Sequence, residues 1–358
     1  MTYLKTCDIL TAGGAMNRPT VNDIAREAGV SLATVDRVLN ARPGVKEKTV
    51  SAVHEAIDRL GYVRDIAAAN LARQRQYRFV AALPDGDSQF IETLDQALVE
   101  AAQAAAANRV ALEIIRYPAE DAHQLAQLLG QFSPEETQGV ALTAPETPVL
   151  RDAVRALRKS GIPVIALASD LPNSERDHFV GIDSRAAGRT AGVLMGRFVG
   201  SGGGQIMTVA QSMQLRDAIE RRRGFDEVMQ TEFPTLEVLP SLEFHGSDAA
   251  MRQAVAECLR NAKAVQGIYL LGSGHRALSA VLADLGLTGR FVVIGHEMTA
   301  HTRRALMAGH IDAVITQNLG HLARSALRVM RAKADRVAID QAQEQLRIEI
   351  VMKENLVF

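Results

Sequence analysis

One short predicted helix near the amino terminus presents side chains that suit contact with DNA. Its outward positions are Ser31, Leu32, Ala33, Thr34 and Arg37, which are polar, basic or, at Leu32 and Ala33, apolar. Small side chains permit close approach to a nucleic acid, and a guanidinium such as that of Arg37 can pair bidentately with guanine. This surface therefore predicts binding in the major groove.

Two helices joined by a tight turn must hold this surface in place. Thr20 and Asp23 form a capping-box pattern at the start of the first helix. Gly29 ends that helix, because glycine adopts the left-handed conformation without a Cβ clash. Ser31 can cap the second helix, and a third apolar helix is expected over residues 45–60. The pattern is typical of a helix-turn-helix, and an ordinary helical hairpin in a core is the alternative.

The same segment resembles the amino-terminal region of the lactose-repressor (LacI/GalR) family. The resemblance rests on VNDIAREAGVSLATVDRVLN, the apolar helix that follows and GYVRDIAAANLA. It implies that Leu32, Ala33 and Arg37 meet base edges. It also implies that Ser31, Thr34 and Asn40 hold phosphates and fix the register.

The resemblance further implies a linker that folds into a hinge helix on DNA. Leu71 matches a leucine that enters the minor groove as an apolar wedge, and Ala68 matches a small residue that allows close approach. A flexible, inert alanine-rich linker is the alternative. We therefore divide the chain into a disordered lead (residues 1–17), an all-α headpiece (18–62), a hinge (63–76) and an effector domain (77–358).

From residue 77 onward, apolar β-branched runs alternate with helical stretches. The runs are RFVAALPD, VALEIIRY, GVALTA, IPVIALAS and HFVGID, then QIMTVA, LEVLPSL, GIYLLG, FVVIGH and DAVIT. Such alternation is typical of parallel sheets with helices on both faces, and two sets indicate two similar doubly wound α/β lobes. This part resembles the family's effector domain, which is itself similar to periplasmic sugar-binding proteins (type I). That resemblance implies three crossovers, near Ile182, Gln317 and Gln345, with lobe 1 formed by residues 77–182 and 318–344 and lobe 2 by 183–317 and 345–358.

Polar residues at the carboxyl ends of these strands are candidates for binding a ligand, because ligands of open α/β sheets bind there. They are Asp85, Asp87, Ser169, Asp170, Ser273, Glu297 and Gln317. The resemblance adds Arg221, which stands three residues before Gly224-Phe225, where relatives place an effector-contacting arginine. Carboxylates, an amide and an arginine suit hydroxyl-rich sugars or polyols. The alternative is that each polar residue caps the next helix. Relatives often have Asn-Asp at Ser273-Gly274 and aspartate at Glu297, which leaves the ligand's identity open.

Other patterns argue against an enzyme, a metal site or a bound cofactor. The run from Ser201 to Gly204 lacks the Lys-Ser/Thr ending of a phosphate loop. His275, His296, His301 and His310 do not show metal-ligand spacing. His296 beside Glu297 suits either ligand contact or a cleft wall. No nucleophile with a base and an orienting group can be identified.

Composition is compatible with a cytoplasmic protein of two domains. The 358 residues are 47% hydrophobic with a net charge of −1, so no overall basic field indicates nucleic acid. Cys7 and Cys258 are expected to be unpaired thiols, and neither a membrane span nor a proper signal peptide is evident. Met1 and Met16 are both candidate natural starts.

These features predict a sequence-specific transcriptional regulator, a repressor in the leading interpretation. We expect a homodimer, or a higher assembly of dimers, on near-palindromic operator DNA. A small polar metabolite between the lobes would change operator affinity, by either releasing DNA or promoting binding. The alternative is a solute-binding receptor without a role in gene regulation.

Overall fold

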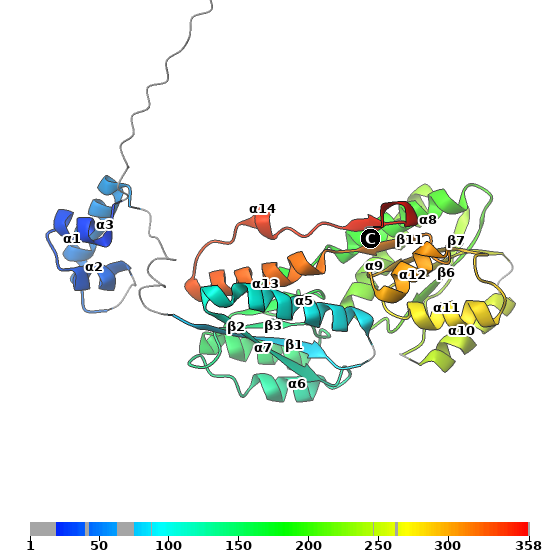
Figure 1. Cartoon of the computed structure of the whole chain (residues 1–358), viewed down its shortest axis with the longest axis horizontal. Coiled ribbons are helices and arrows are strands. Elements are labelled where there is room, and N and C mark those ends of the chain that lie inside the picture. Colours follow the sequence, from blue (N-terminus) through cyan, green and yellow to red (C-terminus); the bar gives the residue numbers. More distant parts are fainter. Residues whose placement is uncertain are drawn as a thin grey trace, which may run out of the picture. The chain divides into compact units, whose positions relative to one another are not determined.

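The computed structural model describes residues 19–39, 43–62, 75–86, 88–245, 247–261 and 264–356. The chain divides into two compact units, Met1–Arg75 and Gln76–Phe358 (Figure 1). Several predicted features lie outside the described residues. They are the amino-terminal lead, most of the hinge, and the site residues Asn40, Ala68, Leu71 and Asp87.

In its described residues, the amino-terminal unit has three helices, α1 (Val21–Glu27), α2 (Leu32–Leu39) and α3 (Glu47–Leu60). The predicted capping box is present, since the Asp23 carboxylate accepts hydrogen bonds from the Thr20 N–H at 2.8 Å and the Thr20 hydroxyl at 2.7 Å. Gly29 ends α1 in the left-handed conformation, with a φ of 63°. Apolar side chains from all three helices form the core, with Ile24, Val35 and Val53 completely buried.

The third helix starts two residues later than the sequence predicted. Lys46 is extended and precedes the first helical residue, Glu47, so Val45 packs on the core from outside the helix. Gly61 then ends α3 with a left-handed φ of 60°.

The first lobe of the carboxy-terminal unit contains a five-stranded parallel sheet with the order β2-β1-β3-β4-β5. Its strands are β1 (Tyr77–Pro84), β2 (Val110–Tyr117), β3 (Gly139–Leu142), β4 (Val164–Leu167) and β5 (His178–Val180). Its helices are α5 (Gln89–Ala105), followed by the 3-10 turn η1 (Ala106–Asn108), α6 (Ala122–Leu129) and α7 (Pro148–Ser160). Alternate β1 residues face opposite layers: Phe79 packs in the α5 layer, and Val80 in the layer of α6 and α7.

The second lobe has a seven-stranded sheet with the order β12-β11-β10-β9-β6-β7, and β8 also pairs with β6. Its strands are β6 (Gly204–Ala210), β7 (Leu236–Val238), β8 (Leu242–Glu243), β9 (Val265–Leu270), β10 (Val292–His296), β11 (Ala313–Thr316) and β12 (Glu349–Val351). Its helices are α8 (Ser184–Val199), α9 (Arg216–Glu232), α10 (Asp248–Asn261), α11 (His275–Asp284) and α12 (Ala300–Met307), and the 3-10 turn η2 (Lys353–Asn355) follows β12. All pairings are parallel except β11 with β12. The predicted fold class is confirmed.

One predicted strand is divided. The run LEVLPSL forms β7 and β8, which are separated by Pro240 and pair with opposite ends of β6. Proline has no N–H to donate to a ladder, so a continuous strand cannot form through it.

The chain passes between the lobes three times. After β5 it enters the second lobe at α8, and after β11 it returns through α13 (Leu319–Asp335), which packs beside α5 on the first sheet (Figure 1). The short helix α14 (Gln341–Glu344) is tied to α13 by Glu344, which accepts hydrogen bonds from the Arg328 guanidinium at 2.7 Å. The chain then adds β12 to the second sheet. None of the described helices is both long and apolar enough to cross a bilayer.

Candidate functional site

The outer face of α2 carries the side chains predicted to contact DNA. The exposed ones include Leu32, which is 50% exposed, Ala33 and Arg37. The Ser31 hydroxyl caps the helix, accepting a hydrogen bond from the Thr34 N–H at 3.2 Å, and Thr34 is half-buried. Val35 and Val38 are buried on the opposite side of the helix. The surface thus combines a guanidinium with small side chains, and its contacts with DNA remain a prediction.

In the carboxy-terminal unit, the strand ends of the second lobe meet at a buried arginine. Arg221 is 3% exposed and donates hydrogen bonds to the Leu271 carbonyl at 2.8 Å and to the Glu297 carboxylate at 3.0 Å. Asp217, one helical turn earlier on α9, places a second carboxylate oxygen 3.3 Å from the same guanidinium. Two of the predicted residues, Arg221 and Glu297, are therefore brought together and paired with one another.

The backbone holds Glu297 in an unusual conformation. Its φ is 72°, a left-handed value that is uncommon outside glycine, directly after β10. The Glu297 N–H donates to the Ile315 carbonyl at 3.0 Å, and its own carbonyl accepts from the Thr302 hydroxyl at 3.1 Å. Burial raises the pKa of Glu297, while the neighbouring Arg221 charge acts in the opposite direction. Burial would lower the pKa of Arg221, but the carboxylates of Asp217 and Glu297 raise it overall, so the arginine keeps its charge.

Close packing of two helices fixes the position of Arg221. Gly188 of α8 lies against the backbone of Arg221, and Gly224 of α9 lies against the backbone of Arg185. A Cβ atom at either glycine would come well inside 3.0 Å of a carbonyl oxygen, so only glycine permits this approach. The two glycines therefore allow α8 and α9 to pack closely, and this close packing sets the position of the Arg221 side chain in the lobe.

The remaining predicted ligand residues lie at strand ends but do not share one cluster. Asp170 is held by Arg176 of its own loop, with one N–H···O contact of 2.7 Å. The Ser273 hydroxyl donates to the Gln211 side-chain oxygen at 2.6 Å. Asp85 is exposed and Ser169 half-buried. Asp85 does not cap the next helix, because Ser88 occupies the cap of α5.

Gln317 is 4% exposed, and its side-chain oxygen has no hydrogen-bond partner within the described part of the chain. Buried amide oxygens normally have a partner, so this atom is an acceptor open to a ligand or a water molecule.

Sequence reasoning missed three charged or polar residues of this region. Asp217 could have been found, because it stands four residues before Arg221 on a predicted helix, where side chains face one another. Gln211 follows β6 in the way that the predicted residues follow their strands. Glu146 gave no such signal, since its partner is on the other lobe.

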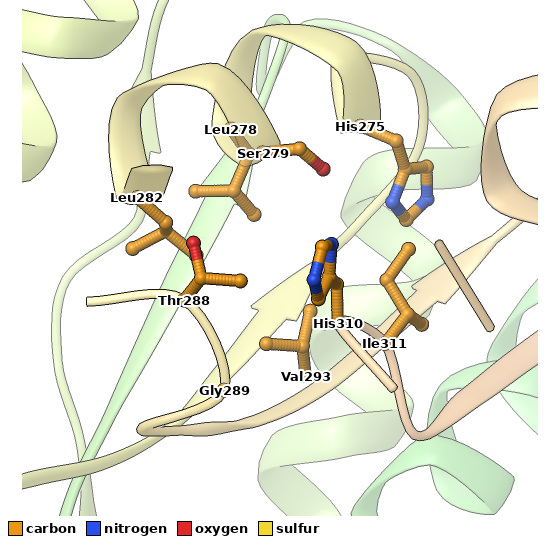
Figure 2. Close-up of a pocket in the computed structure, with 9 residues that line it drawn as sticks. All are labelled: His275, Leu278, Ser279, Leu282, Thr288, Gly289, Val293, His310 and Ile311. Carbon is orange, nitrogen blue, oxygen red and sulfur yellow. The ribbon is translucent and has the colours of Figure 1, made fainter. Parts of the chain in front are cut away.

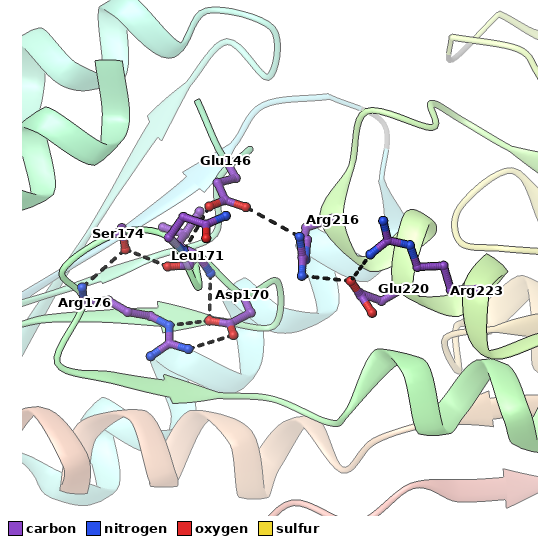
Figure 3. Close-up of polar contacts among 9 residues, drawn as sticks. Glu146, Asp170, Leu171, Ser174, Arg176, Arg216, Glu220 and Arg223 are labelled. Atoms are coloured by element: carbon purple, nitrogen blue, oxygen red, sulfur yellow. Dashed lines mark hydrogen bonds and ion pairs between the residues drawn. The ribbon is translucent and has the colours of Figure 1, made fainter. Parts of the chain in front are cut away.

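An ion pair connects the two lobes (Figure 3). Glu146, between β3 and α7, lies 4.0 Å from Arg216 at the start of α9. Arg216 also pairs with Glu220 at 2.8 Å, and Glu220 pairs with Arg223 at 3.1 Å. The backbone N–H of Asn173 donates to Glu146 at 3.0 Å. This chain of contacts joins loops of the first lobe to α9, the helix that also carries Arg221.

A cavity of about 770 Å³ lies beside this network, at the crossovers between the lobes. Its walls include Asp170 and Phe179 of the first lobe, Asp217 of the second, and the connecting segments at Ile182 and Gln345. The volume is in the range typical of small-molecule sites. Asp217 thus joins the buried arginine cluster to an open space.

Two buried histidines, His296 and His275, lie close to Glu297 in the chain or through a hydrogen bond to its neighbour. The Nε2 of His296 lies 2.7 Å from the Tyr269 hydroxyl, and the Nε2–H of His275 donates to the His296 carbonyl at 2.9 Å. His275 lines a cavity of about 10 Å³, room for no more than one water molecule. Figure 2 shows the side chains that line it. Within the described residues, no group of three or more His, Cys, Asp or Glu side chains could hold a metal ion.

Lowering the pH from 7 to 5 is expected to destabilise the protein in part through His275. Burial lowers the pKa of His275 from 6.5 to about 4. The unfolded state therefore binds more protons between these two values, so this stability is complete above pH 6.5 and is lost as the pH falls toward 4. The linkage amounts to about 2 kcal/mol between pH 7 and pH 5.

Urea unfolding of the wild type and of His275→Gln at both pH values measures this contribution. The variant should lose less stability than the wild type on acidification. His123→Gln is the control, because His123 is exposed. Equal pH dependence in all three proteins would contradict the assignment.

Comparison with known families gives two matches. Residues 79–336 match the periplasmic binding protein domain family, and residues 20–65 match the lacI family of bacterial regulatory proteins. Over 150 residues the chain is 32% identical to Catabolite control protein A of Priestia megaterium, and this alignment covers 42% of this chain and 43% of that protein. It is 27% identical over 216 residues to the HTH-type transcriptional regulator CelR of Thermobifida fusca, covering 59% of this chain and 61% of that one. These alignments span less than two thirds of each relative.

Solved structures resemble the carboxy-terminal unit. GanP, a glucose-galactose binding protein from Geobacillus stearothermophilus, aligns with a TM-score of 0.70 at 19% identity, covering 79% of this chain and all of that one. An ABC transporter solute binding protein from Burkholderia graminis, in complex with D-arabinose, aligns with a TM-score of 0.67 at 20% identity, covering 78% of this chain and 96% of that one. At these identities the likeness establishes the fold.

Proposed function

We propose, from the premise that the chain belongs to the periplasmic binding protein domain family and carries a lacI-family regulatory domain, that it is a ligand-controlled transcriptional regulator, acting as a repressor. The observation that carries this proposal is the exposed face of α2, with Arg37 on a lacI-family helix-turn-helix. A solute-binding receptor would need only the carboxy-terminal unit and would leave this surface without a role.

In this proposal α2 enters the major groove of an operator. Arg37 pairs with a guanine, Leu32 and Ala33 make apolar contacts with base edges, and Ser31, Thr34 and Asn40 hold phosphates. Leu71 and Ala68 would act at the minor groove when the hinge folds. A homodimer in the cytoplasm would place two such units on a near-palindromic site.

The ligand would be a small polar metabolite, such as a sugar or polyol, bound between the lobes. Arg221, Glu297 and Gln317 would contact it from the second lobe. The other candidates at strand ends are Asp85, Asp87, Ser169, Asp170 and Ser273. Binding would change the angle between the lobes and so the population of the DNA-binding state; a tenfold change needs only about 1.4 kcal/mol of differential affinity.

Arg37→Ala is expected to weaken binding to the preferred DNA sequence by about 5- to 150-fold, since a bidentate arginine–guanine pair contributes roughly 1–3 kcal/mol of discrimination. The sequence is first selected from random duplexes with the wild-type protein, and affinities are then compared by gel shift. Arg59→Ala, on α3 and paired with Glu27, serves as the control and should bind normally. Failure of the wild type to enrich any sequence would refute the proposed function.

A further inference from the structure

The charges around Arg221 are unequal. One guanidinium lies within 3.3 Å of carboxylate oxygens from both Asp217 and Glu297. When all three groups are ionised, the cluster carries a net charge of one negative unit. Its members are shielded from water to different degrees, because the side chain of Arg221 is 4% exposed and that of Asp217 is 25% exposed. Charges in such a place are weakly screened, so the sign of an incoming ligand matters strongly.

The same region contains buried polar atoms that lack partners. The Nε of Arg221 is a donor without an acceptor, and the side-chain oxygen of Gln317 is an acceptor without a donor, as far as the described chain extends. Leaving such groups unsatisfied is unfavourable. A hydroxyl group both donates and accepts, so a ligand rich in hydroxyls can satisfy either atom without bringing a charge.

Asp217 is the member of the cluster that reaches the open space. It lines the cavity at the crossovers, whereas Arg221 and Glu297 do not. The other charged side chains on that wall also have partners. They are Asp170 with Arg176, Arg216 with Glu220, Arg185 with Glu227, Glu344 with Arg328, and Asp183 with the Ala186 N–H. A ligand in the cavity therefore meets the Asp217 carboxylate before it can reach the guanidinium.

We propose that Asp217, together with Glu297, makes this site select uncharged, hydroxyl-rich ligands and reject phosphorylated or acidic ones. This inference rests on the proposed function and names its ligand class. An arginine facing one carboxylate could still attract an anion. With two carboxylates in contact, the charge of the arginine is more than neutralised, and an approaching anion is repelled. The site would thus discriminate by an unfavourable interaction with the wrong class of ligand.

Inorganic phosphate tests the proposal without knowledge of the natural ligand. Thermal unfolding of the full chain is measured at slightly alkaline pH, with phosphate or with sodium chloride at the same ionic strength. The wild type should show no phosphate-specific rise in Tm that depends on Arg221. Asp217→Asn should gain a rise of about 2 °C or more, because a bound anion stabilises the folded state by mass action. Adding Arg221→Gln to that variant should abolish the gain.

Asp226→Asn is the matched control, since Asp226 is on the same helix and pairs with Arg222 instead. Glu297→Gln provides a second variant with the same expected gain. A phosphate-specific stabilisation of the wild type that Arg221→Gln removes would overturn the proposal. So would the absence of any gain in both carboxylate variants relative to the control. Gel shifts with the same proteins report separately on the proposed function, because DNA binding can fail while the phosphate comparison succeeds.

Discussion

Gly188→Ala is expected to destabilise the carboxy-terminal unit by about 3 kcal/mol, because the added methyl group overpacks the contact between α8 and α9. The new Cβ would come far inside 3.0 Å of the Arg221 carbonyl oxygen, and a helix backbone cannot yield as a flexible side chain can. Helix propensity acts in the opposite direction, favouring alanine by about 1 kcal/mol at a helix interior. The steric effect should dominate. Urea unfolding followed by circular dichroism measures the difference.

Gly202→Ala is the control for this substitution. Gly202 is in the turn after α8, its φ is outside the left-handed region, and a Cβ there would meet nothing within 4 Å. Its unfolding midpoint should stay near that of the wild type. A rise of stability in Gly188→Ala, of the size that helix propensity alone gives, would show that α8 and α9 can separate freely and that Arg221 is not positioned by this contact.

Arg221→Met is the second large effect that we expect. Removing the cation leaves the Asp217 and Glu297 carboxylates near one another without their partner, and breaking a buried pair in this way costs roughly 3–5 kcal/mol. The loss should be smaller in the double variant Arg221→Met/Glu297→Gln, which removes one of the two stranded charges. Arg223→Met is the control, because that side chain is 60% exposed and pairs with Glu220 instead of with Asp217 or Glu297.

The pH dependence of Arg221→Met gives an independent check. Burial already raises the pKa of Glu297, and loss of Arg221 should raise it further. A group whose pKa is higher in the folded state contributes stability at low pH that is lost as the pH rises through the folded value. The difference in stability between Arg221→Met and the wild type should therefore shrink on acidification. A difference that does not change with pH would contradict the role given to Glu297.

Much of this molecule follows from local sequence signals. The capping box at Thr20, the glycine at position 29 and the apolar spacing of the helices predict the three-helix unit, because each acts within about one helical turn. The alternating runs of the larger unit predict its strands in the same way, and α7 has the bounds predicted from its sequence, Pro148–Ser160. The prediction of one strand over LEVLPSL was wrong, because it relied on the apolar residues and ignored the proline between them.

The residue types at the strand ends were also identifiable from the sequence, since a parallel sheet must place those ends at one edge. Which of them would pair was not. Glu297 meets Arg221 from 76 residues away, whereas Asp217 pairs with the same guanidinium locally, from one helical turn earlier on α9. Glu146 reaches Arg216 across the lobes, a pairing that no spacing along the chain encodes.

The sequence by itself determined the helix-turn-helix, the two α/β lobes and the set of polar residues available to a ligand. Only the tertiary structure decided that the central arginine is matched by two carboxylates rather than left free to bind an anion. The physical reason is one of range: capping and periodicity act between neighbours in the chain, whereas the balance of charge in a buried site depends on which distant segments the packing brings into contact.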